Sequence, residues 1–526
     1  MGRLHYDPRG PLRAEMGVAT LALLAFLLLA CGGDKQQPAS PAGASYVPQP
    51  LGPAAPASVP APAGYKLLKT SPEKGIVGTP FTITGEGLPP GKSLQFVWVT
   101  WDGSYVTKTL PETVQYFDRE FAEKRVILTP TSGPTSTDAA GRLTASFVAP
   151  EDYGEIHDVY AVVDGQEVGK AGFRIVRNVT IAPTEGPIGT PVSIKVTGLA
   201  WKPFESTLAV RYDNKYTGFI AATTTRGTVM AHIRAAGPVG DHTVEVGQSS
   251  AAVPYLNPEQ SPVAHLGSFR FAFKVTKDAG PPTATIDWPE DNRVLLSTGT
   301  PRTTADQSLT AGASASFTTS SGPILSQTTL NAAGLPSDAE IDLVWVTAKG
   351  NRISPSGWSL EQVSLRKTRA GKDGSLSAVI DIPDDLGGWH VVKLVQGDKV
   401  MAQVPYFVER SFGGETPRRV KAGETFQVQI KGVGWTELDN GFAVTYDNAY
   451  IGYSCGFNSQ GDVTMNLVAT GGRGTHLIDI YPMIFKGQGK APWNYELPIL
   501  SFKQDAPGLA LGYRLPAFRV AIEVID

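Results

Sequence analysis

GLPPGKSLQFVWVT, residues 87–100, returns in the same pattern as GLPSDAEIDLVWVT, residues 334–347. In both copies a turn rich in Gly and Pro leads into alternating apolar and polar residues, which is typical of a half-buried β-strand. The copies begin 247 residues apart. GRLTASFVAPEDYG at 141–154 likewise returns as GSLSAVIDIPDDLG at 374–387. Repetition of strands and turns at one offset indicates that an all-β unit was duplicated.

A second pair of segments extends the duplication. YDNKYTGF at 212–219 matches YDNAYIGY at 446–453, with an offset of 234 residues. The same offset relates Gly189 to Gly423 and Trp201 to Trp435. The repeated unit therefore contains two domains, the first corresponding to the third and the second to the fourth.

The opening of the second domain, Pro183 to Leu199, resembles the start of bacterial IPT/TIG-type immunoglobulin-like domains, as does Gly240 to Val246 further on. The resemblance implies antiparallel β-sandwiches. We predict an all-β chain of four tandem immunoglobulin-like sandwiches, with insertions near 106–135 and 348–370. The divisions expected are a signal peptide at 1–30, a lipidated Cys and Pro/Ala-rich stalk at 31–64, sandwiches at 65–177 and 178–277, a linker at 278–308, and sandwiches at 309–410 and 411–526. The linker is expected to lend a strand to the third sandwich.

Composition fits this architecture. Of 526 residues, 57 are Gly and 41 are Pro, which favours turns and short strands over long helices. The net charge is -3 and no basic stripe stands out, so we expect no nucleic-acid partner. Two cysteines, Cys31 and Cys455, give no disulfide framework if Cys31 carries lipid.

The amino terminus indicates the location. An apolar run, Gly17 to Ala30, follows a positively charged stretch and is too short to cross a bilayer comfortably. It ends in Leu28-Leu29-Ala30-Cys31, which resembles the bacterial lipobox. That resemblance implies cleavage before Cys31, acylation of its sulfur, and an outer-membrane or cell-surface location. The alternative is an uncleaved anchor helix. The Pro-rich tract that follows is predicted to be an extended stalk.

Several apparent chemical motifs have structural interpretations. His157, His242, His390 and His476 open the same late strand in the four domains, which favours an architectural position over a metal site. EGLPPGKS at 86–93 lacks the first glycine of a phosphate loop and leads into a strand. The carboxylate pairs Glu151-Asp152 and Asp384-Asp385 are expected in solvated turns. We therefore assign no catalytic residue, metal ligand or cofactor.

Aromatic and turn residues divide in the same way. Trp98 and Trp345 are expected in the core, whereas Trp101, Tyr105 and Trp358 lie in or beside the insertions and are expected to be exposed. For those three, ordinary packing is favoured over contacts with sugar or protein. In the YDN segments, Tyr212 and Tyr446 should end a buried row with a hydroxyl partner at the rim, and Asp-Asn should form the turn.

The function expected is non-catalytic: an envelope lipoprotein that presents its domains for binding protein or glycan, or as a scaffold. One alternative is an accessory subunit of an envelope export or polysaccharide complex. The other, least favoured, is an enzyme with a site in the insertions.

Overall fold

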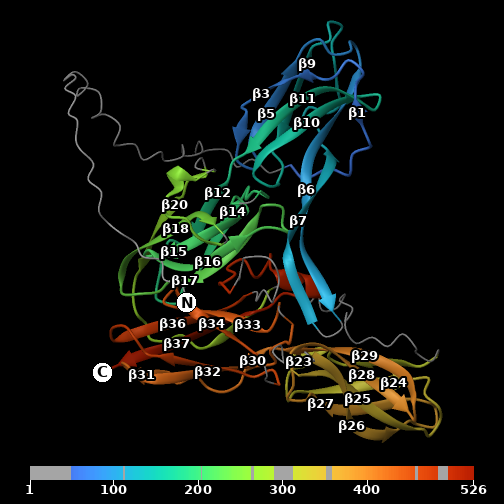
Figure 1. Ribbon diagram of the computed structural model, residues 1–526, viewed down its shortest axis with the longest axis vertical. Coiled ribbons are helices and arrows are strands. Elements are labelled where there is room, and N and C mark those ends of the chain that lie inside the picture. The colour runs from blue at the N-terminus through green and yellow to red at the C-terminus, as the bar shows by residue number, and fades with distance from the viewer. Residues whose placement is uncertain are drawn as a thin grey trace, which may run out of the picture. The chain divides into compact units, whose positions relative to one another are not determined.

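The structure is a computed structural model that describes residues 49–526, apart from 111–112, 203, 251, 262, 264–265, 290–311, 351–357, 437, 457–459 and 484–495. In this part of the chain the named elements are strands and two short 3-10 helices, grouped in four β-sandwiches (Figure 1). The all-β prediction is confirmed.

The first sandwich pairs the sheet β3-β5-β9 with the sheet β1-β11-β10-β6-β7, to which β2, β4 and β8 add short pairings. Its strands are β1 (Val59–Pro60), β2 (Lys66–Leu67), β3 (Lys69–Ser71), β4 (Lys74–Gly75), β5 (Pro80–Gly85), β6 (Ser93–Leu110), β7 (Thr113–Ile127), β8 (Thr135–Ser136), β9 (Leu143–Val148), β10 (Glu155–Val163) and β11 (Gln166–Ile175). The predicted insertion is a long hairpin, β6–β7, drawn as pale-blue arrows in Figure 1.

The second sandwich pairs the sheet β12-β14-β17 with the sheet β13-β20-β18-β15-β16. Its elements are β12 (Asn178–Ala182), β13 (Glu185–Gly186), β14 (Pro191–Thr197), β15 (Thr207–Tyr212), β16 (Lys215–Ala221), β17 (Val229–Arg234), β18 (Gly240–Ser250), β19 (Val253–Pro254), η1 (Pro258–Gln260) and β20 (Phe269–Val275).

The third sandwich pairs the sheet β22-β24-β27 with the sheet β23-β29-β28-β25-β26. Its strands are β22 (Ser314–Phe317), β23 (Ser321–Pro323), β24 (Gln327–Ala333), β25 (Glu340–Gly350), β26 (Trp358–Arg369), β27 (Leu376–Asp381), β28 (Gly388–Gln396) and β29 (Lys399–Glu409).

The fourth sandwich pairs the sheet β30-β32-β35 with the sheet β21-β37-β36-β33-β34. Its elements are β21 (Thr285–Asp287), β30 (Ser411–Phe412), β31 (Arg419–Lys421), β32 (Thr425–Lys431), β33 (Gly441–Tyr446), β34 (Ala449–Cys455), β35 (Val463–Val468), β36 (Gly474–Pro482), η3 (Pro507–Leu511) and β37 (Ala517–Ile525). The linker strand β21 pairs with β37, so it joins the fourth sandwich and not the third, as had been expected.

All four sandwiches share one topology. In each, a short strand runs parallel to the last strand of the larger sheet: β4 with β11, β13 with β20, β23 with β29 and β31 with β37. This arrangement is immunoglobulin-like and confirms four tandem sandwiches of that type. Because all four agree, the correspondence of first with third and second with fourth must be read from side chains, described below.

The Pro-rich tract departs from the expectation of a free stalk at its carboxyl end. Val59 and Pro60 pair with β11, and isolated bridges join Gln49 to Pro150 and Ala54 to Val126. An extended Pro-rich backbone keeps its carbonyl groups available as acceptors, so it can lie along a sandwich. Residues 49–64 therefore belong to the first sandwich in this structure, and residues 31–48 of the proposed stalk lie outside the described part.

The sandwiches are not independent modules. The hydrophobic core of the second sandwich includes Ile499, Leu500 and Phe502 from the fourth, each no more than 1% exposed. These side chains belong to a long connection between β36 and β37. The second and fourth sandwiches thus share part of one core.

Candidate binding groove

The four late-strand histidines are bound to backbone groups. In each, Nε2 lies 2.7–2.8 Å from the carbonyl oxygen of the residue four positions earlier. The pairs are His157 with Tyr153, His242 with Pro238, His390 with Leu386 and His476 with Gly472. This is the architectural role predicted from the repeat, and no cluster of three or more candidate metal ligands occurs among the described residues.

A buried Trp–Asp contact distinguishes the first and third sandwiches. Trp98 Nε1 donates to Asp152 at 2.7 Å, and Trp345 Nε1 donates to Asp385 at 2.8 Å. Asp152 is fully buried, so its expected place in a solvated turn is wrong, and Asp385 is half-buried. An indole N–H in a core needs an acceptor, and the carboxylate supplies it. Both tryptophans lie in the core as predicted.

The YDN hairpins distinguish the second and fourth sandwiches. Tyr212 donates its hydroxyl to the carbonyl of Ala236 at 2.9 Å, and Asp213 and Asn214 adopt φ of 48° and 63°. Asp213 also accepts a bond from the Thr243 N–H at 2.9 Å. The fourth sandwich repeats these contacts with Tyr446 and Thr470, and with Asp447 and Leu477. The prediction of a structural turn with a rim partner for each tyrosine is confirmed.

The aromatics near the insertions are packed. Trp101 stacks on Trp201 with ring centroids 3.5 Å apart, and the Tyr105 hydroxyl donates to Asp505 at 2.9 Å. Both lie half-buried on strand β6, so the expected exposure is wrong and the packing interpretation holds. Trp358 begins β26, and its side chain lies outside the described residues.

Each half of the chain has the same closely packed joint between its two sandwiches. Gly154 donates its N–H to Leu199 and Gly387 donates to Val433, at 3.2 and 3.0 Å. A Cβ on either glycine would lie within 2.0 Å of a carbonyl oxygen across the joint, so only glycine fits. These matched joints, together with the Trp–Asp and YDN contacts, support the duplicated two-domain unit.

The connection from Glu496 to Ala506, called here the bridging segment, fills an opening at one edge of the second sandwich. That opening lies between β16 and β17, the terminal strands of the two sheets. Phe219 N–H donates to Pro498 at 3.0 Å, and Leu500 N–H donates back to Phe219 at 2.9 Å. His232 N–H, on β17, donates to Leu500 at 3.1 Å. The bridging segment therefore bonds to both edge strands as an added strand.

Asp505 completes the attachment. Its carboxylate accepts bonds from the N–H groups of Thr223 and Thr224, both at 2.8 Å, and from the Thr224 hydroxyl at 2.7 Å. It also accepts the Tyr105 hydroxyl, which brings the β6–β7 hairpin to the same point. Asp505 is fully buried, and these donors replace the water that a buried carboxylate lacks.

Charged residues also join the second and fourth sandwiches. Arg234 on β17 lies 2.7 Å from Asp479 on β36, and Arg519 on β37 lies 3.1 Å from Asp287. Burial opposes ionisation of Asp287, yet Arg519 and Lys503 hold its pKa below the ordinary value. Such buried pairs favour one docking geometry, because a displaced partner would leave an uncompensated charge.

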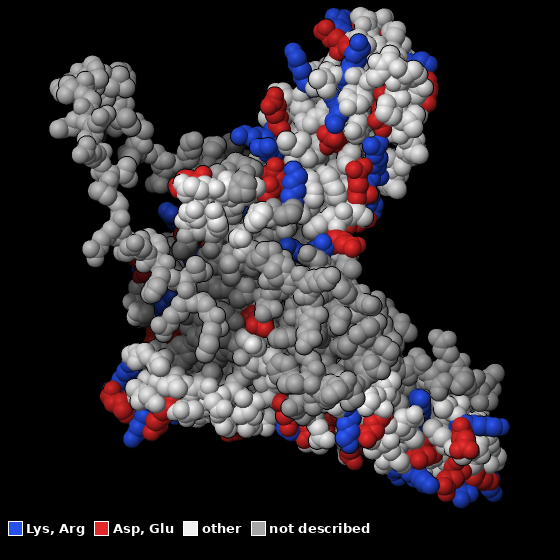
Figure 2. Space-filling model, in the orientation of Figure 1, with Lys and Arg blue, Asp and Glu red and all other residues white. Residues whose placement is uncertain are grey.

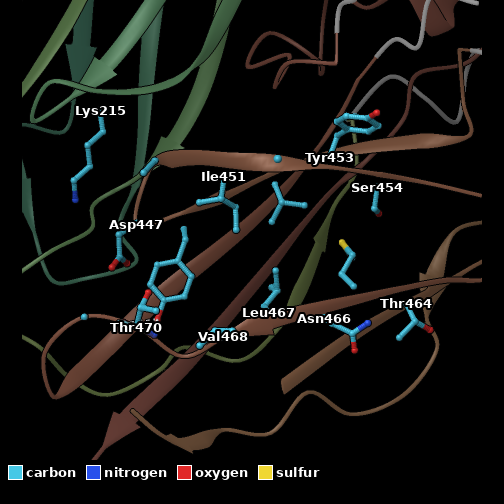
Figure 3. Close-up of a pocket in the computed structure, with 16 residues that line it drawn as sticks. Lys215, Asp447, Ile451, Tyr453, Ser454, Thr464, Asn466, Leu467, Val468 and Thr470 are labelled. Atoms are coloured by element: carbon cyan, nitrogen blue, oxygen red, sulfur yellow. Dashed lines mark hydrogen bonds between the residues drawn. The ribbon is translucent and has the colours of Figure 1, made fainter. Parts of the chain in front are cut away.

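The corresponding opening in the fourth sandwich is a groove of about 760 Å³ between β34 and β35, the terminal strands of its sheets. Figure 3 shows Ile451 extending from β34 and Leu467 from β35 into the space between the two strands. Lys215 and Asp447 lie at one end and Thr464 and Asn466 at the other (Figure 3). The remaining lining residues are Val444, Tyr446, Ala449, Gly452, Tyr453, Ser454, Met465, Val468, Thr470 and Gly471.

Matched positions differ sharply in exposure. Thr217 and Phe219 of β16 are 0% and 4% exposed, whereas their counterparts Ile451 and Tyr453 of β34 are 51% and 47% exposed. On the facing strand, Arg234 is 6% exposed and its counterpart Val468 is 47% exposed. The second sandwich is thus covered where the fourth is open.

The groove has the chemistry of a binding surface. Apolar side chains predominate, and its carboxylate, Asp447, is engaged by His476 Nδ1. Burial opposes protonation of His476, but Asp447 raises its pKa above the ordinary value. Burial raises the pKa of Tyr446, so its hydroxyl stays protonated and bonded to Thr470. These groups orient the hairpin and leave a largely apolar surface for a ligand.

Cys31, the predicted lipid-attachment residue, lies outside the described residues. Cys455 is half-buried at the end of β34, whereas its counterpart Ala221 is buried. Within the described ranges no helix is both long and apolar enough to cross a membrane.

Comparisons with known proteins give no family. No family model and no curated protein matches the chain. Among solved structures it is similar to a Salmonella alpha-2-macroglobulin at 10% identity and a TM-score of 0.15, covering 91% of this chain and 31% of that one. It is also similar to the eight amino-terminal Ig domains of Down syndrome cell adhesion molecule, at 14% identity and a TM-score of 0.17, covering 84% and 45%. A biofilm-associated protein domain matches at 9% identity and a TM-score of 0.13, covering 83% and 96%.

The chain therefore spans about a third and under half of the first two proteins. The TM-scores are too low to assign function or family from the likeness.

Sequence reasoning missed the groove and the bridging segment. One signal was present: counterparts in the second and fourth sandwiches are 234 residues apart up to Gly240 and Gly474, but Val275 and Val524, which pair with those glycines, are 249 apart. The fourth sandwich therefore carries 15 additional residues in this connection. The bridging segment lies within that longer connection.

Proposed function

We propose that this chain is a non-catalytic binding protein of the bacterial cell envelope, anchored by lipid on Cys31 and presenting the groove of the fourth sandwich to a protein partner. The open groove carries the proposal, because the chain closes the matching groove of the second sandwich with its own bridging segment. Exposed apolar side chains at a sheet edge mark an interaction surface.

The use of the polar residues supports binding over catalysis. The four late-strand histidines contact backbone carbonyls, and Asp152 and Asp505 accept bonds from neutral donors. Each of these groups thus has a structural role that accounts for its burial.

The surface charge supports a protein partner over nucleic acid. On the face drawn in Figure 2, Lys and Arg are interspersed with Asp and Glu over the described residues. Pairs such as Arg125 with Glu167 and Lys170 with Asp158, at 2.6 and 2.8 Å, neutralise neighbouring charges. A polyanion gains little from such a mixed surface.

The binding role is tested in cells with the full, lipid-bearing chain. A photo-crosslinking amino acid at Ile451 should capture an envelope protein, whereas the same group at Val379, on β27 of the third sandwich, should not. Both residues are 51% exposed, so they are matched for accessibility. Equal yields from the two positions, or no adduct at Ile451, would contradict the proposal.

The anchor is tested separately. Cys31→Ser should release the protein from the membrane fraction or stop its processing, because the acyl chains are attached to that sulfur. Mass spectrometry should find acylated Cys31 as the first residue of the mature protein. A mature chain that still begins at Met1, or that lacks acyl groups, would refute this part of the proposal.

A further inference from the structure

The bridging segment shows what kind of ligand this edge of the fold accepts. Between β16 and β17 it lies extended, exchanges backbone bonds with Phe219, and accepts one from His232. Leu500 is fully buried in the core of the second sandwich. The affinity of an added strand comes from main-chain bonds and its specificity from pockets for alternate side chains.

A glycine provides the space for the leucine. A Cβ on Gly218 would lie 2.9 Å from the Leu500 side chain and 2.6 Å from the Pro498 carbonyl oxygen, so the segment packs directly on the glycine backbone. Gly452, its counterpart in the fourth sandwich, has no described atom within 4 Å of the same position. The hollow that receives Leu500 in one sandwich is therefore present and unfilled in the other.

The surroundings of that hollow suit the same mode of binding. Ser454 and Gly452 pair with Phe442 and Val444, so the inner face of β34 is small, while Met465 and Leu467 lie opposite on β35. Asn466 corresponds to His232, whose N–H binds the inserted strand in the second sandwich. A narrow apolar slot between two sheet edges accepts an extended chain.

The chain cannot fill both openings itself. Its bridging segment occupies the second sandwich and is held there by Asp505. A second copy of the chain would have its own bridging segment engaged in the same way.

We propose that the groove of the fourth sandwich binds an extended peptide strand of a partner protein, inserted between β34 and β35 with a leucine-sized side chain over Gly452. This deepens the proposed function and rests on it: the partner is defined by a strand of the type Pro-aliphatic-Leu-small, as in Pro498-Ile499-Leu500-Ser501.

The probe for the test is a synthetic peptide with the sequence of residues 496–506, ELPILSFKQDA, labelled at its amino end. Binding to the full chain in detergent should be saturable by fluorescence polarisation. A peptide N-methylated at the position of Leu500 keeps every side chain but loses the N–H that donates in the second sandwich. It should bind at least about tenfold more weakly, as should a peptide with Asp in place of that leucine.

The protein side of the test uses the same matched pair of positions. Ile451→Asp places a charge in the groove and should weaken peptide binding by at least about tenfold, whereas Val379→Asp should leave it unchanged. Circular dichroism and the melting temperature show whether each variant is folded. If Ile451→Asp unfolds the chain, the N-methylated peptide still decides the matter.

Three outcomes would overturn strand insertion. They are absence of peptide binding, binding that N-methylation does not weaken, and dimerisation of the chain that Ile451→Asp abolishes, since a second copy would then be the occupant. An envelope protein cross-linked at Ile451 without peptide binding would refute strand insertion but keep the binding role. Absence of any cross-linked protein would refute the binding role itself.

Discussion

At the tip of the YDN hairpin of the second sandwich, Asp213 uses both carboxylate oxygens within its own sandwich. One accepts the Thr243 N–H and the other lies 2.6 Å from His242 Nδ1. Asp213→Ala removes both contacts and should lower the free energy of unfolding by about 0.5–2 kcal/mol. Urea denaturation measures the change, with exposed Asp241→Ala as control.

Partner binding should be unaffected by Asp213→Ala, because the carboxylate has structural contacts that account for it. Loss of binding at an unchanged melting temperature would contradict this and make the hairpin tip a functional surface.

His232, on β17, should make stability depend on pH. Burial, with Lys503 and Arg519 nearby, lowers its pKa to about 4, although Asp287 opposes the shift. The unfolded chain takes up a proton at this residue below about pH 6.5, but the folded chain does so only near pH 4. This residue's contribution to stability is therefore present above about pH 6.5 and is lost as the pH falls towards 4.

His232→Asn, which copies Asn466 of the fourth sandwich, should reduce the loss of unfolding free energy between pH 7 and 4.5 by on the order of 1–3 kcal/mol. His476 has a raised pKa and acts with the opposite sign, so the two proteins must be compared at both pH values. Parallel urea curves for variant and parent would rule out this role for His232.

Some residue roles could be predicted from the sequence. The Asp-Asn turn has its own local chemistry, and four histidines in one register indicate an architectural position. The role of Asp152 could not be predicted from its neighbours, because its donors, Trp98 and Thr100, lie on a distant strand. A buried tryptophan predicts that an acceptor exists but not which residue supplies it.

The bridging segment makes one edge of the second sandwich depend on a connection of the fourth. Asp505→Ala would leave the Thr223 and Thr224 N–H groups without their acceptor and should lower the free energy of unfolding by about 2–4 kcal/mol. Asp505→Asn keeps one acceptor oxygen and should have an intermediate effect.

Chemical denaturation of the three proteins tests this order. Equal stability of Asp505→Ala and the parent would mean that the bridging segment is not anchored at Asp505.

At the level of elements, alternation and turns predicted strands well, and the repeat offset predicted which sandwiches correspond. The position of the bridging segment could not be predicted locally. Leu497 to Phe502 is an ordinary apolar stretch, and its partner Phe219 lies 280 residues from Leu500's neighbour Ile499 in the chain. Only the longer connection in the fourth sandwich distinguished the two copies.

The two halves of the molecule are joined by a shared core and by buried ion pairs, in addition to the linker. After cleavage of the chain within residues 290–311, the halves should therefore remain associated and co-elute in gel filtration. Leu500→Asp places a carboxylate in the shared core and should cause the cleaved halves to separate. Separation of the cleaved parent halves at micromolar concentration would show that the linker alone holds them together.

The number of grooves and strands sets how many partners the molecule can take. It has two equivalent acceptors, β16/β17 and β34/β35, but one bridging segment to donate, and that donor is already bound within the chain. In the language of polymer chemistry its functionality is one. Under the proposed mode of binding, each chain can take up a single foreign strand and has none to pass on, so it ends an assembly and cannot propagate a fibre by strand exchange.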